Sequence, residues 1–401
     1  MPEISPLSLF WEGFELAGYR ERGDGALVLR LQPCSQIPPC CSGCAQRTID
    51  IHDVSLRRVR ERDLFDRRVY LEVPVRRVRC GHCGVRSEAL AWLAGRRRLT
   101  AAMVRHVEAL VRLWPIQQVA ELLGLHWHTV KAIDAARLAR EVVEPDRVPL
   151  RRLLIDEFAL HRGHRYATVV ACADTQAVLW IGEGRSREAL RPFFEWLGDH
   201  CHAIEAVAMD MNSAFDLEVR AHCANAEVVY DLFHVVAKYG REVIDRVRVD
   251  QANALREDKP ARRAIKRGRW LLLRNADNLS ADQAVKLDEL LAANAPLTTV
   301  YVLKTQLKEL WYAPSAAEAQ RRWRQWLALA HESGIPALIT FARRLQPYLA
   351  GILASARYRL NTSVLEGMNN RIKVIKRMAY GYRDTAYFFL KIRAAFPGKV
   401  R

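Results

Sequence analysis

The sequence lacks several features that define whole classes of protein. It has no apolar run of roughly 18 residues, so it has no segment that can cross a membrane as a helix. Its first residues lack the basic segment and apolar core of a secretory signal, so we expect a cytoplasmic protein. Cysteine is scarce, at 9 of 401 residues. Without an export signal, two Cys-x-x-Cys pairs favour metal binding over disulfides.

Acidic residues are also few relative to basic ones, and they are unevenly distributed. The formal net charge is +17, and residues 241–401 alone hold 30 basic and 14 acidic residues. Residues 151–240 are the exception, with 13 acidic and 9 basic residues. Such a basic chain is typical of proteins that bind a polyanion, usually nucleic acid, although dispersed surface charge is an alternative. Carboxylates held inside a basic protein of this kind indicate metal ions.

Residues 1–95 are predicted to form a β-rich module that binds zinc. Cys41 and Cys44 form one pair, and Cys80 and Cys83 form the other. Each Cys-x-x-Cys turn places two thiolates near one tetrahedral centre, which is the donor set that Zn²⁺ prefers. Cys40 adjoins Cys41 and competes with it as a ligand, and two pairs of unligated buried thiols are the alternative. The strand predicted at Val69–Val78 contains Pro74, which favours an edge position.

Residues 96–148 are predicted to form three helices. Thr100 is a plausible N-cap for the first, and Gly124 makes a tight turn before the third, which is predicted over His126–Arg140. This pattern is typical of a helix-turn-helix domain that inserts its third helix into the DNA major groove, and an ordinary helical hairpin is the alternative. The side chains expected to reach DNA lie at the start of the third helix: His126, His128, Thr129 and Lys131.

Residues 149–240 change character and alternate between strands and helices. The predicted order is three strands, a helix, a strand, a helix and a strand, with a turn at Arg162–His164 between the first two strands. This order indicates an α/β sheet with an antiparallel portion. Residues 241–355 show only helical patterns, and their tryptophans are expected in the core. Their basic run, which extends from Arg262 to Arg269, fits a solvated helix face and a phosphate-binding one, and the large positive charge of the region favours the second.

Three carboxylates stand where a metal-dependent enzyme would place them. Asp156 lies in an apolar strand, Asp210 ends another, and Glu366 lies in the first turn of the C-terminal helix. Phosphodiester chemistry commonly uses two divalent ions, and Mg²⁺ takes carboxylate oxygens from different elements. Strand alternation places Glu157 on the opposite face from Asp156. For Glu366 the alternative is a capping box with Ser363.

Asp231 and His234 follow the last predicted strand. They are candidates to support the carboxylates, and a helix N-cap by Asp231 is an equal alternative.

The motifs together resemble those of a known family. The sequence resembles bacterial insertion-sequence DDE transposases of the ISL3 group over nearly the whole chain, most specifically at its C-terminal block. The segments that carry the resemblance are residues 154–157, 208–211, 230–234, 366–373 and 377–382. The resemblance implies a multidomain α+β protein: a zinc-binding module, a helix-turn-helix, and a ribonuclease-H-like α/β catalytic domain (residues 149–240 and 356–401) interrupted by an all-helical insertion (residues 241–355).

The same resemblance implies an activity. Asp156, Asp210 and Glu366 would form a catalytic triad that binds Mg²⁺ or Mn²⁺, and Lys373 and Arg377 would hold DNA phosphates. The enzyme would bind the terminal inverted repeats of its own element, hydrolyse a phosphodiester and transfer the strand to target DNA. We expect a homodimer or larger synaptic complex in the bacterial nucleoid. The alternatives are a DNA-binding regulator derived from a transposase and a ribonuclease-H-like nuclease.

Overall fold

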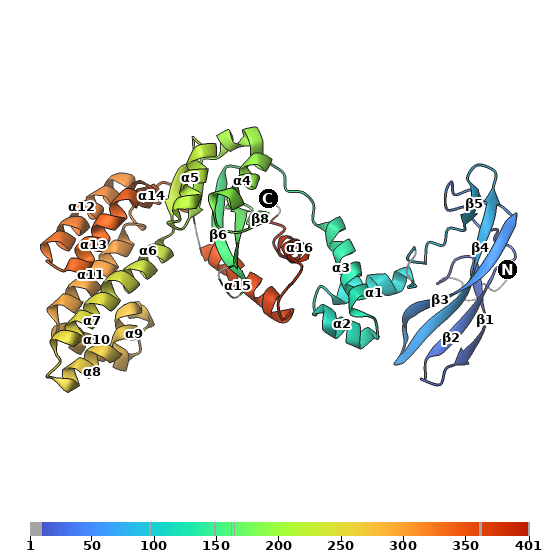
Figure 1. Cartoon of the computed structure of the whole chain (residues 1–401), viewed down its shortest axis with the longest axis horizontal. Coiled ribbons are helices and arrows are strands. Elements are labelled where there is room, and N and C mark those ends of the chain that lie inside the picture. Colours follow the sequence, from blue (N-terminus) through green and yellow to red (C-terminus); the bar gives the residue numbers. More distant parts are fainter. Residues whose placement is uncertain are drawn as a thin grey trace. The chain divides into compact units, whose positions relative to one another are not determined.

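The computed structural model describes residues 10–95, 98–147, 150–161, 163, 165–360 and 363–399. The chain divides into two compact units, Met1–Glu141 and Val142–Arg401, and each is described by itself (Figure 1). The turn predicted at Arg162–His164 is mostly outside the described residues, as is the side chain of Ser363, the partner of Glu366 in the capping box. Among the described residues, no helix has both the length and the apolar character that crossing a membrane requires.

The first unit begins with a five-stranded sheet in the order β1-β2-β4-β3, with β5 paired to β4. The strands are β1 (Phe14–Glu21), β2 (Leu27–Pro33), β3 (Ile51–Leu64), β4 (Arg67–Cys80) and β5 (Gly84–Ser87). Phe14, Leu71 and Val73 lie in its core. β4 as a whole is an inner strand and not the edge strand that Pro74 predicts. At Pro74 itself, however, only β3 is a partner, because β2 pairs with residues 69–72 of β4 and β5 with residues 77–80.

Three helices complete this unit: α1 (Ala101–Leu110), α2 (Ile116–Leu123) and α3 (Trp127–Glu141). The predicted N-cap is confirmed, because Thr100 Oγ1 accepts a hydrogen bond from the Met103 amide at 3.1 Å. Gly124 ends α2 with a φ of +58°, and a Cβ at this position would lie 2.6 Å from Cζ of Arg68. The positive φ favours glycine, whereas the guanidinium of Arg68 is the end of a flexible side chain that could move aside. Val119, Val130 and other apolar side chains form the common core of the three helices.

The second unit contains a five-stranded mixed sheet in the order β10-β9-β6-β7-β8. β6, β7 and β8 are antiparallel, whereas β9 runs parallel to β6 and β10 parallel to β9. The predicted order of strands and helices is therefore observed. The elements are β6 (Arg152–His161), β7 (Arg165–Cys172), β8 (Val178–Glu183), α4 (Arg187–Leu197), β9 (Ala206–Met209), α5 (Ser213–His222) and β10 (Glu227–Tyr230).

Helices cover both faces of this sheet. Leu153 and Ile155 of β6 pack in the cluster that contains α4 and α5. Leu154 and Phe158 point to the other face, where they meet α15 (Ser363–Met378) and α16 (Thr385–Ala395). The apolar stripe predicted for the C-terminal helix faces this core: three of its residues are buried and the fourth is partly buried.

Between β10 and α15 the described residues, 231–360, contain helices and no strand, as predicted. The helices are α6 (Leu232–Tyr239), α7 (Asp245–Ala254), α8 (Lys259–Arg267), α9 (Arg269–Leu273), α10 (Ala281–Ala292), α11 (Ala295–Glu309), α12 (Ala316–Glu332), α13 (Pro336–Leu345) and α14 (Leu349–Ala354). α14 packs closely on β10, since a Cβ on Gly351 would lie 2.5 Å from the Tyr230 ring. Trp323 and Trp326 are buried as expected, but Trp270 is 63% exposed.

Candidate active site and DNA-binding surfaces

The first predicted carboxylate is held between the sheet and α15. Asp156 lies on the face of β6 that also carries Leu154 and Phe158. Its Oδ2 accepts a hydrogen bond from Asn369 Nδ2 of α15 at 2.6 Å, and its Oδ1 accepts one from the Glu157 amide at 2.7 Å. Burial raises the pKa of Asp156 to about 6, with the backbone hydrogen bond from Glu157 opposing the rise.

Asp210 directly follows β9, the strand that runs parallel to β6. Burial raises its pKa, and the carboxylate of Glu157 adds to the rise. Its Oδ1 atom is buried and has no hydrogen-bond partner among the described residues, and the same is true of Asn369 Oδ1. An unpaired buried oxygen costs free energy, so this end of the sheet holds acceptor atoms that lack a donor or cation.

A histidine supplies a positive charge that acts on both of these acids. His234 Nδ1 lies 2.8 Å from Oδ2 of Asp231, and Asp231 also caps α6 by accepting the Phe233 amide at 2.8 Å. The hydrogen bond from Asp231 raises the pKa of His234 to about 9, and the charges of Asp210 and Asp156 act in the same direction. The imidazole is therefore a cation at neutral pH. The N-cap predicted for Asp231 is confirmed, and the same carboxylate also contacts His234.

Glu366 lies on α15, the helix that also carries Asn369, but it does not touch Asp156 or Asp210. It is exposed, one turn before Asn369, and shares an exposed side of α15 with Lys373 and Arg377. In the described part of the chain, the three predicted carboxylates do not form a group whose ligand atoms all lie within 4.8 Å of one another. The structure thus places Asp156 and Asp210 in one electrostatic cluster, with the helix of Glu366 packed against it.

Glu157 lies on the predicted face of β6, opposite Asp156, but it also interacts with Asp210, which was not expected from the sequence. Its Oε2 accepts a hydrogen bond from Asn212 Nδ2 at 3.4 Å, two residues after Asp210, and its Oε1 lies 3.2 Å from Arg185. The charge of Glu157 raises the pKa of Asp210. β9 ends at Met209, directly before Asp210.

These residues fit a hard divalent cation. Mg²⁺ and Mn²⁺ take oxygen ligands, and the cluster offers the carboxylates of Asp156 and Asp210 with one buried oxygen unpaired. The Asn369 amide was not predicted as a site residue. The sequence signal that could have identified Asn369 was its position one turn after Glu366 on the same helix.

The four predicted zinc ligands converge. The Sγ atoms of Cys41, Cys44, Cys80 and Cys83 all lie within 4.8 Å of one another, and those of Cys44 and Cys80 are 3.4 Å apart. Backbone amides, first that of His82, lower the pKa of Cys80 to about 6. A thiolate at neutral pH and four sulfur atoms around one point match a structural zinc site.

The structure also separates Cys40 from this group. Its Sγ donates a hydrogen bond to the Ala45 carbonyl oxygen at 3.0 Å, away from the other thiols. Gly43 packs against the group so tightly that a Cβ would lie 2.9 Å from Sγ of Cys83. Of the two adjacent cysteines, Cys41 is therefore the one in position to bind a metal.

The start of α3 presents the predicted DNA-reading residues at the surface. His126 and His128 are exposed and their rings stack at 5.3 Å, and Thr129 and Lys131 are half-buried beside them. Trp127 was not predicted, yet it is 38% exposed, and the Lys131 ammonium lies 5.7 Å from the centroid of its ring.

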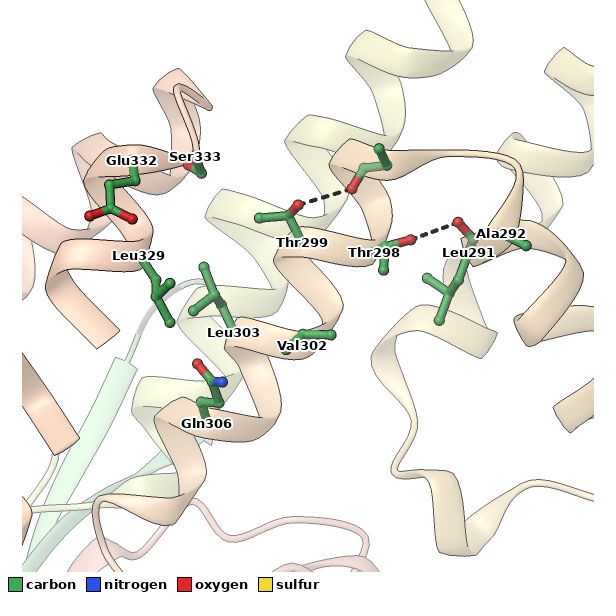
Figure 2. Close-up of a pocket in the computed structure, with 11 residues that line it drawn as sticks. Leu291, Ala292, Thr298, Thr299, Val302, Leu303, Gln306, Leu329, Glu332 and Ser333 are labelled. Carbon is green, nitrogen blue, oxygen red and sulfur yellow. Dashed lines mark hydrogen bonds between the residues drawn. The ribbon is translucent and has the colours of Figure 1, made fainter. Parts of the chain in front are cut away.

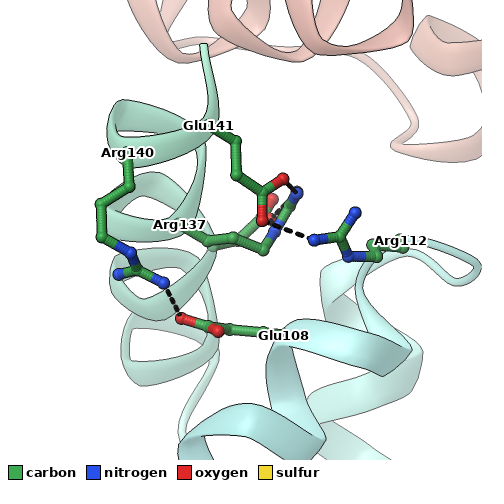
Figure 3. Close-up of polar contacts among 6 residues, drawn as sticks. Glu108, Arg112, Arg137, Arg140 and Glu141 are labelled. Carbon is green, nitrogen blue, oxygen red and sulfur yellow. Dashed lines mark hydrogen bonds and ion pairs between the residues drawn. The ribbon is translucent and has the colours of Figure 1, made fainter. Parts of the chain in front are cut away.

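Ion pairs join α3 to α1 and to Arg112, which follows α1 (Figure 3). Arg140 donates to Glu108 at 2.6 Å, and Arg112 and Arg137 both donate to Glu141, at 2.5 and 2.6 Å. Arg112 and Arg140, which make the two pairs between the segments, are exposed, and such pairs typically contribute about 0–1 kcal/mol each. The buried pair of Arg137 with Asp134 lies within α3, so it stabilises this helix and not its orientation.

A cavity of about 720 Å³ lies among α10, α11 and α12 (Figure 2). Its lining is mainly apolar and includes Leu291, Val302 and Leu329. The hydroxyl of Thr298 points back to the Leu291 carbonyl oxygen, 2.6 Å away. None of the predicted site residues lines this cavity, so it is separate from the carboxylate cluster.

Comparison with known proteins decides the family. A model of the ISL3 transposases, described as a transposase, matches residues 153–392, more than half of the chain. The chain belongs to the ISL3 family of DDE transposases. A zinc-finger model of the IS204/IS1001/IS1096/IS1165 transposases matches residues 37–83 of this transposase, and a helix-turn-helix model of transposase family ISL3 matches residues 88–138.

Full-length relatives agree. The transposase is 54% identical over 395 residues to the transposase for insertion sequence element IS1001 of Bordetella parapertussis, which covers 98% of this chain and 97% of that protein. It is 28% identical over 390 residues to the transposase for element IS1557 of Mycobacterium tuberculosis, which covers 91% and 87% respectively. The protein is accordingly a DNA transposase with a zinc ribbon and a helix-turn-helix.

Proposed function

We propose that this transposase binds the terminal inverted repeats of its own element and cuts them at a site formed by Asp156, Asp210 and Glu366. The observation that carries the proposal is the buried, unpaired carboxylate oxygen of Asp210 beside Asp156. Burying two acids destabilises a fold unless a cation compensates them. The partial compensation by His234 supports this reasoning, since its charge faces the same two acids.

The three acids would hold Mg²⁺ or Mn²⁺. When bound, such ions activate the attacking oxygen and stabilise the leaving oxygen of a phosphodiester. Asn369 orients Asp156 through its amide, and Lys373 and Arg377 hold the phosphates of the DNA that α15 faces. The first product is a 3′-OH on the transposon strand, and this hydroxyl then attacks target DNA.

The sheet topology supports a ribonuclease-H-like catalytic domain. Three antiparallel strands are followed by two strands that join parallel to the first, with α4 and α5 as the crossovers. We propose the domain division made from the sequence: residues 1–95 as the zinc module, 96–148 as the helix-turn-helix, 149–240 and 356–401 as the catalytic domain, and 241–355 as the helical insertion.

DNA recognition is assigned to the first unit. Zinc held by Cys41, Cys44, Cys80 and Cys83 would order the ribbon, and His126, His128, Thr129 and Lys131 would read base edges. Both transposon ends must be processed together, so the working form would be a homodimer or larger synaptic complex on the bacterial nucleoid.

The test is Mg²⁺-dependent cleavage of a linear duplex that carries the terminal inverted repeats of the element that encodes this protein. Wild type is compared with Glu366→Gln, which keeps helix propensity but removes the charge. We expect the variant to bind the duplex with unchanged affinity and to cut at least 100-fold more slowly, on the order of the loss of a principal catalytic group. Glu332→Gln, an exposed glutamate of α12, is the matched control.

Normal cutting by Glu366→Gln would remove this residue from the site. Binding without cutting by wild type, in Mg²⁺ and in Mn²⁺, would instead identify a DNA-binding regulator.

A further inference from the structure

The helical region carries one basic surface that the carboxylate site does not use. Five of the nine residues of α8 are cations: Lys259, Arg262, Arg263, Lys266 and Arg267. Their spacing of three and four residues places all of them on one side of the helix, while Ile265 is buried on the other. We call these five residues the α8 stripe.

The stripe is not neutralised by the protein. Among the described residues, no carboxylate oxygen lies within 4.0 Å of any of its five charged groups, whereas Arg248 and Arg269 on the neighbouring helices both pair with Asp245. On α12, Arg321 likewise pairs with Glu318. The buried Nε of Arg262 also has no acceptor in the described part of the chain.

Such an arrangement is costly for an isolated helix. Like charges three and four residues apart repel one another. The helix dipole favours cations in the last turn, where Lys266 and Arg267 lie, but disfavours them near the start, where Lys259, Arg262 and Arg263 lie. Asp258 caps the start of this helix by accepting the Ala261 amide, but it forms no ion pair with the five cations among the described residues. A helix that carries this pattern is suited to a ligand that is itself strongly anionic.

We propose that the α8 stripe binds the phosphodiester backbone of duplex DNA without reading its sequence. This inference rests on the proposed function, because it requires DNA as the substrate. The stripe extends over roughly 12 Å of helix, at about 1.5 Å per residue, and a duplex presents about seven phosphates over that length. Contacts to phosphates carry no sequence information, so the expected contribution is affinity and not specificity.

The position of α8 indicates how far from the cut bond it meets DNA. In Figure 1, α8 lies at the end of the helical region away from the sheet of the same unit. The stripe therefore contacts duplex at a distance from the bond that the carboxylates cut, on either the transposon end or the target.

The experiment compares two triple variants of the full-length protein. The stripe variant is Lys259→Gln, Arg263→Gln, Arg267→Gln, which spaces its three changes one turn apart. The control is Lys286→Gln, Arg324→Gln, Arg343→Gln, which removes the same charge from exposed cations on α10, α12 and α13. Glutamine is a good helix former, and equal thermal unfolding of both variants checks that they fold.

Affinity is measured without divalent ions, from 50 to 200 mM salt, for a duplex carrying the transposon end and for a random duplex of equal length. Each phosphate contact adds about 0.9 to the slope of log K against log salt concentration. If the three changed residues each hold one phosphate, the stripe variant loses about 2.7 from the slope. Over this fourfold salt range, wild type then loses about 40-fold more affinity than the variant.

A smaller slope on both duplexes, with the control unchanged, supports the proposal. A smaller slope on the end duplex alone overturns it, because a contact that ignores sequence must weaken binding to both duplexes. An unchanged slope in the stripe variant, or an equal fall in the control, overturns it. Cleavage by wild type is scored separately, so a failure of the proposed function is distinguishable from a failure of the stripe.

Discussion

Replacing Asp156 with asparagine should make the transposase more stable while abolishing its activity. The side chain is largely buried, and the structure shows how an amide would fit. Asparagine retains the oxygen that accepts the Glu157 amide. Its new NH₂ group would face Asn369, whose own amide can turn over and present the oxygen that now lacks a partner.

The size of the effect follows from the pKa of Asp156. Raising it from 3.8 to about 6 corresponds to about 3 kcal/mol, at about 1.4 kcal/mol per pH unit. Because the folded state holds the proton more tightly, stability falls as pH rises from about 4 to 6, and the full cost applies above that range. Residual solvent contact makes this an upper limit, so we expect a gain of about 1–2 kcal/mol at pH 7.5.

Thermal unfolding of the full-length protein at pH 7.5 and pH 4 provides the assay, with and without Mg²⁺. For a unit of this size, 1–2 kcal/mol raises Tm by about 2–8 °C. At pH 4 the difference should largely disappear. Added Mg²⁺ should stabilise wild type but not Asp156→Asn, because a ligand stabilises only the form that binds it.

Two results would refute this reasoning. One is a Tm for Asp156→Asn at pH 7.5 that is equal to or below that of wild type. The other is a variant that still responds to Mg²⁺ and still cuts DNA, since Asp156 could then be no metal ligand.

Two further predictions concern other parts of the chain. Cys44→Ser should release zinc and weaken binding to the transposon end, whereas Cys40→Ser should retain the zinc and the binding, because of these two residues only Cys44 lies in the four-sulfur group. Metal analysis of the two purified variants tests this, and an equal zinc content would contradict the assignment. Lys304 is buried, which lowers its pKa to about 7, and its Nζ donates to the carbonyl oxygens of Leu272 and Arg274. The unfolded chain holds this proton up to a higher pH, so the free energy of unfolding should rise by up to about 1.4 kcal/mol per pH unit between pH 7 and 9. Lys304→Met should flatten that rise, which urea unfolding at several pH values measures. An equal pH dependence in wild type and variant would exclude Lys304 as its cause.

Much of the fold could be predicted because local signals were strong. The order of strands and helices around Asp156 and Asp210 follows from apolar runs and turn residues, and the cap at Thr100 follows from its side chain. The Cys-x-x-Cys spacing alone reduced the candidate zinc ligands among the nine cysteines to two pairs. In each case a few neighbouring residues determine the outcome.

The remaining features depend on contacts between distant segments. The choice between Cys40 and Cys41 is made by the loop that brings Cys80 and Cys83 close, which spacing does not specify. The role of Asn369 required knowing which turn of α15 meets β6. The exposure of Trp270, expected in the core, depends on how the short helix α9 sits on its neighbours.

The helical region has a consequence for the timing of synthesis. Asp210 leaves the ribosome about 150 residues before Glu366, with α6 to α14 made in between. At about 5–20 residues per second, a nascent chain waits on the order of 8–30 s with its sheet acids present and α15 still missing. Throughout that interval the emerging protein already has its complete zinc ribbon and helix-turn-helix, so a growing chain holds every element needed to find DNA before it holds every element needed to cut it.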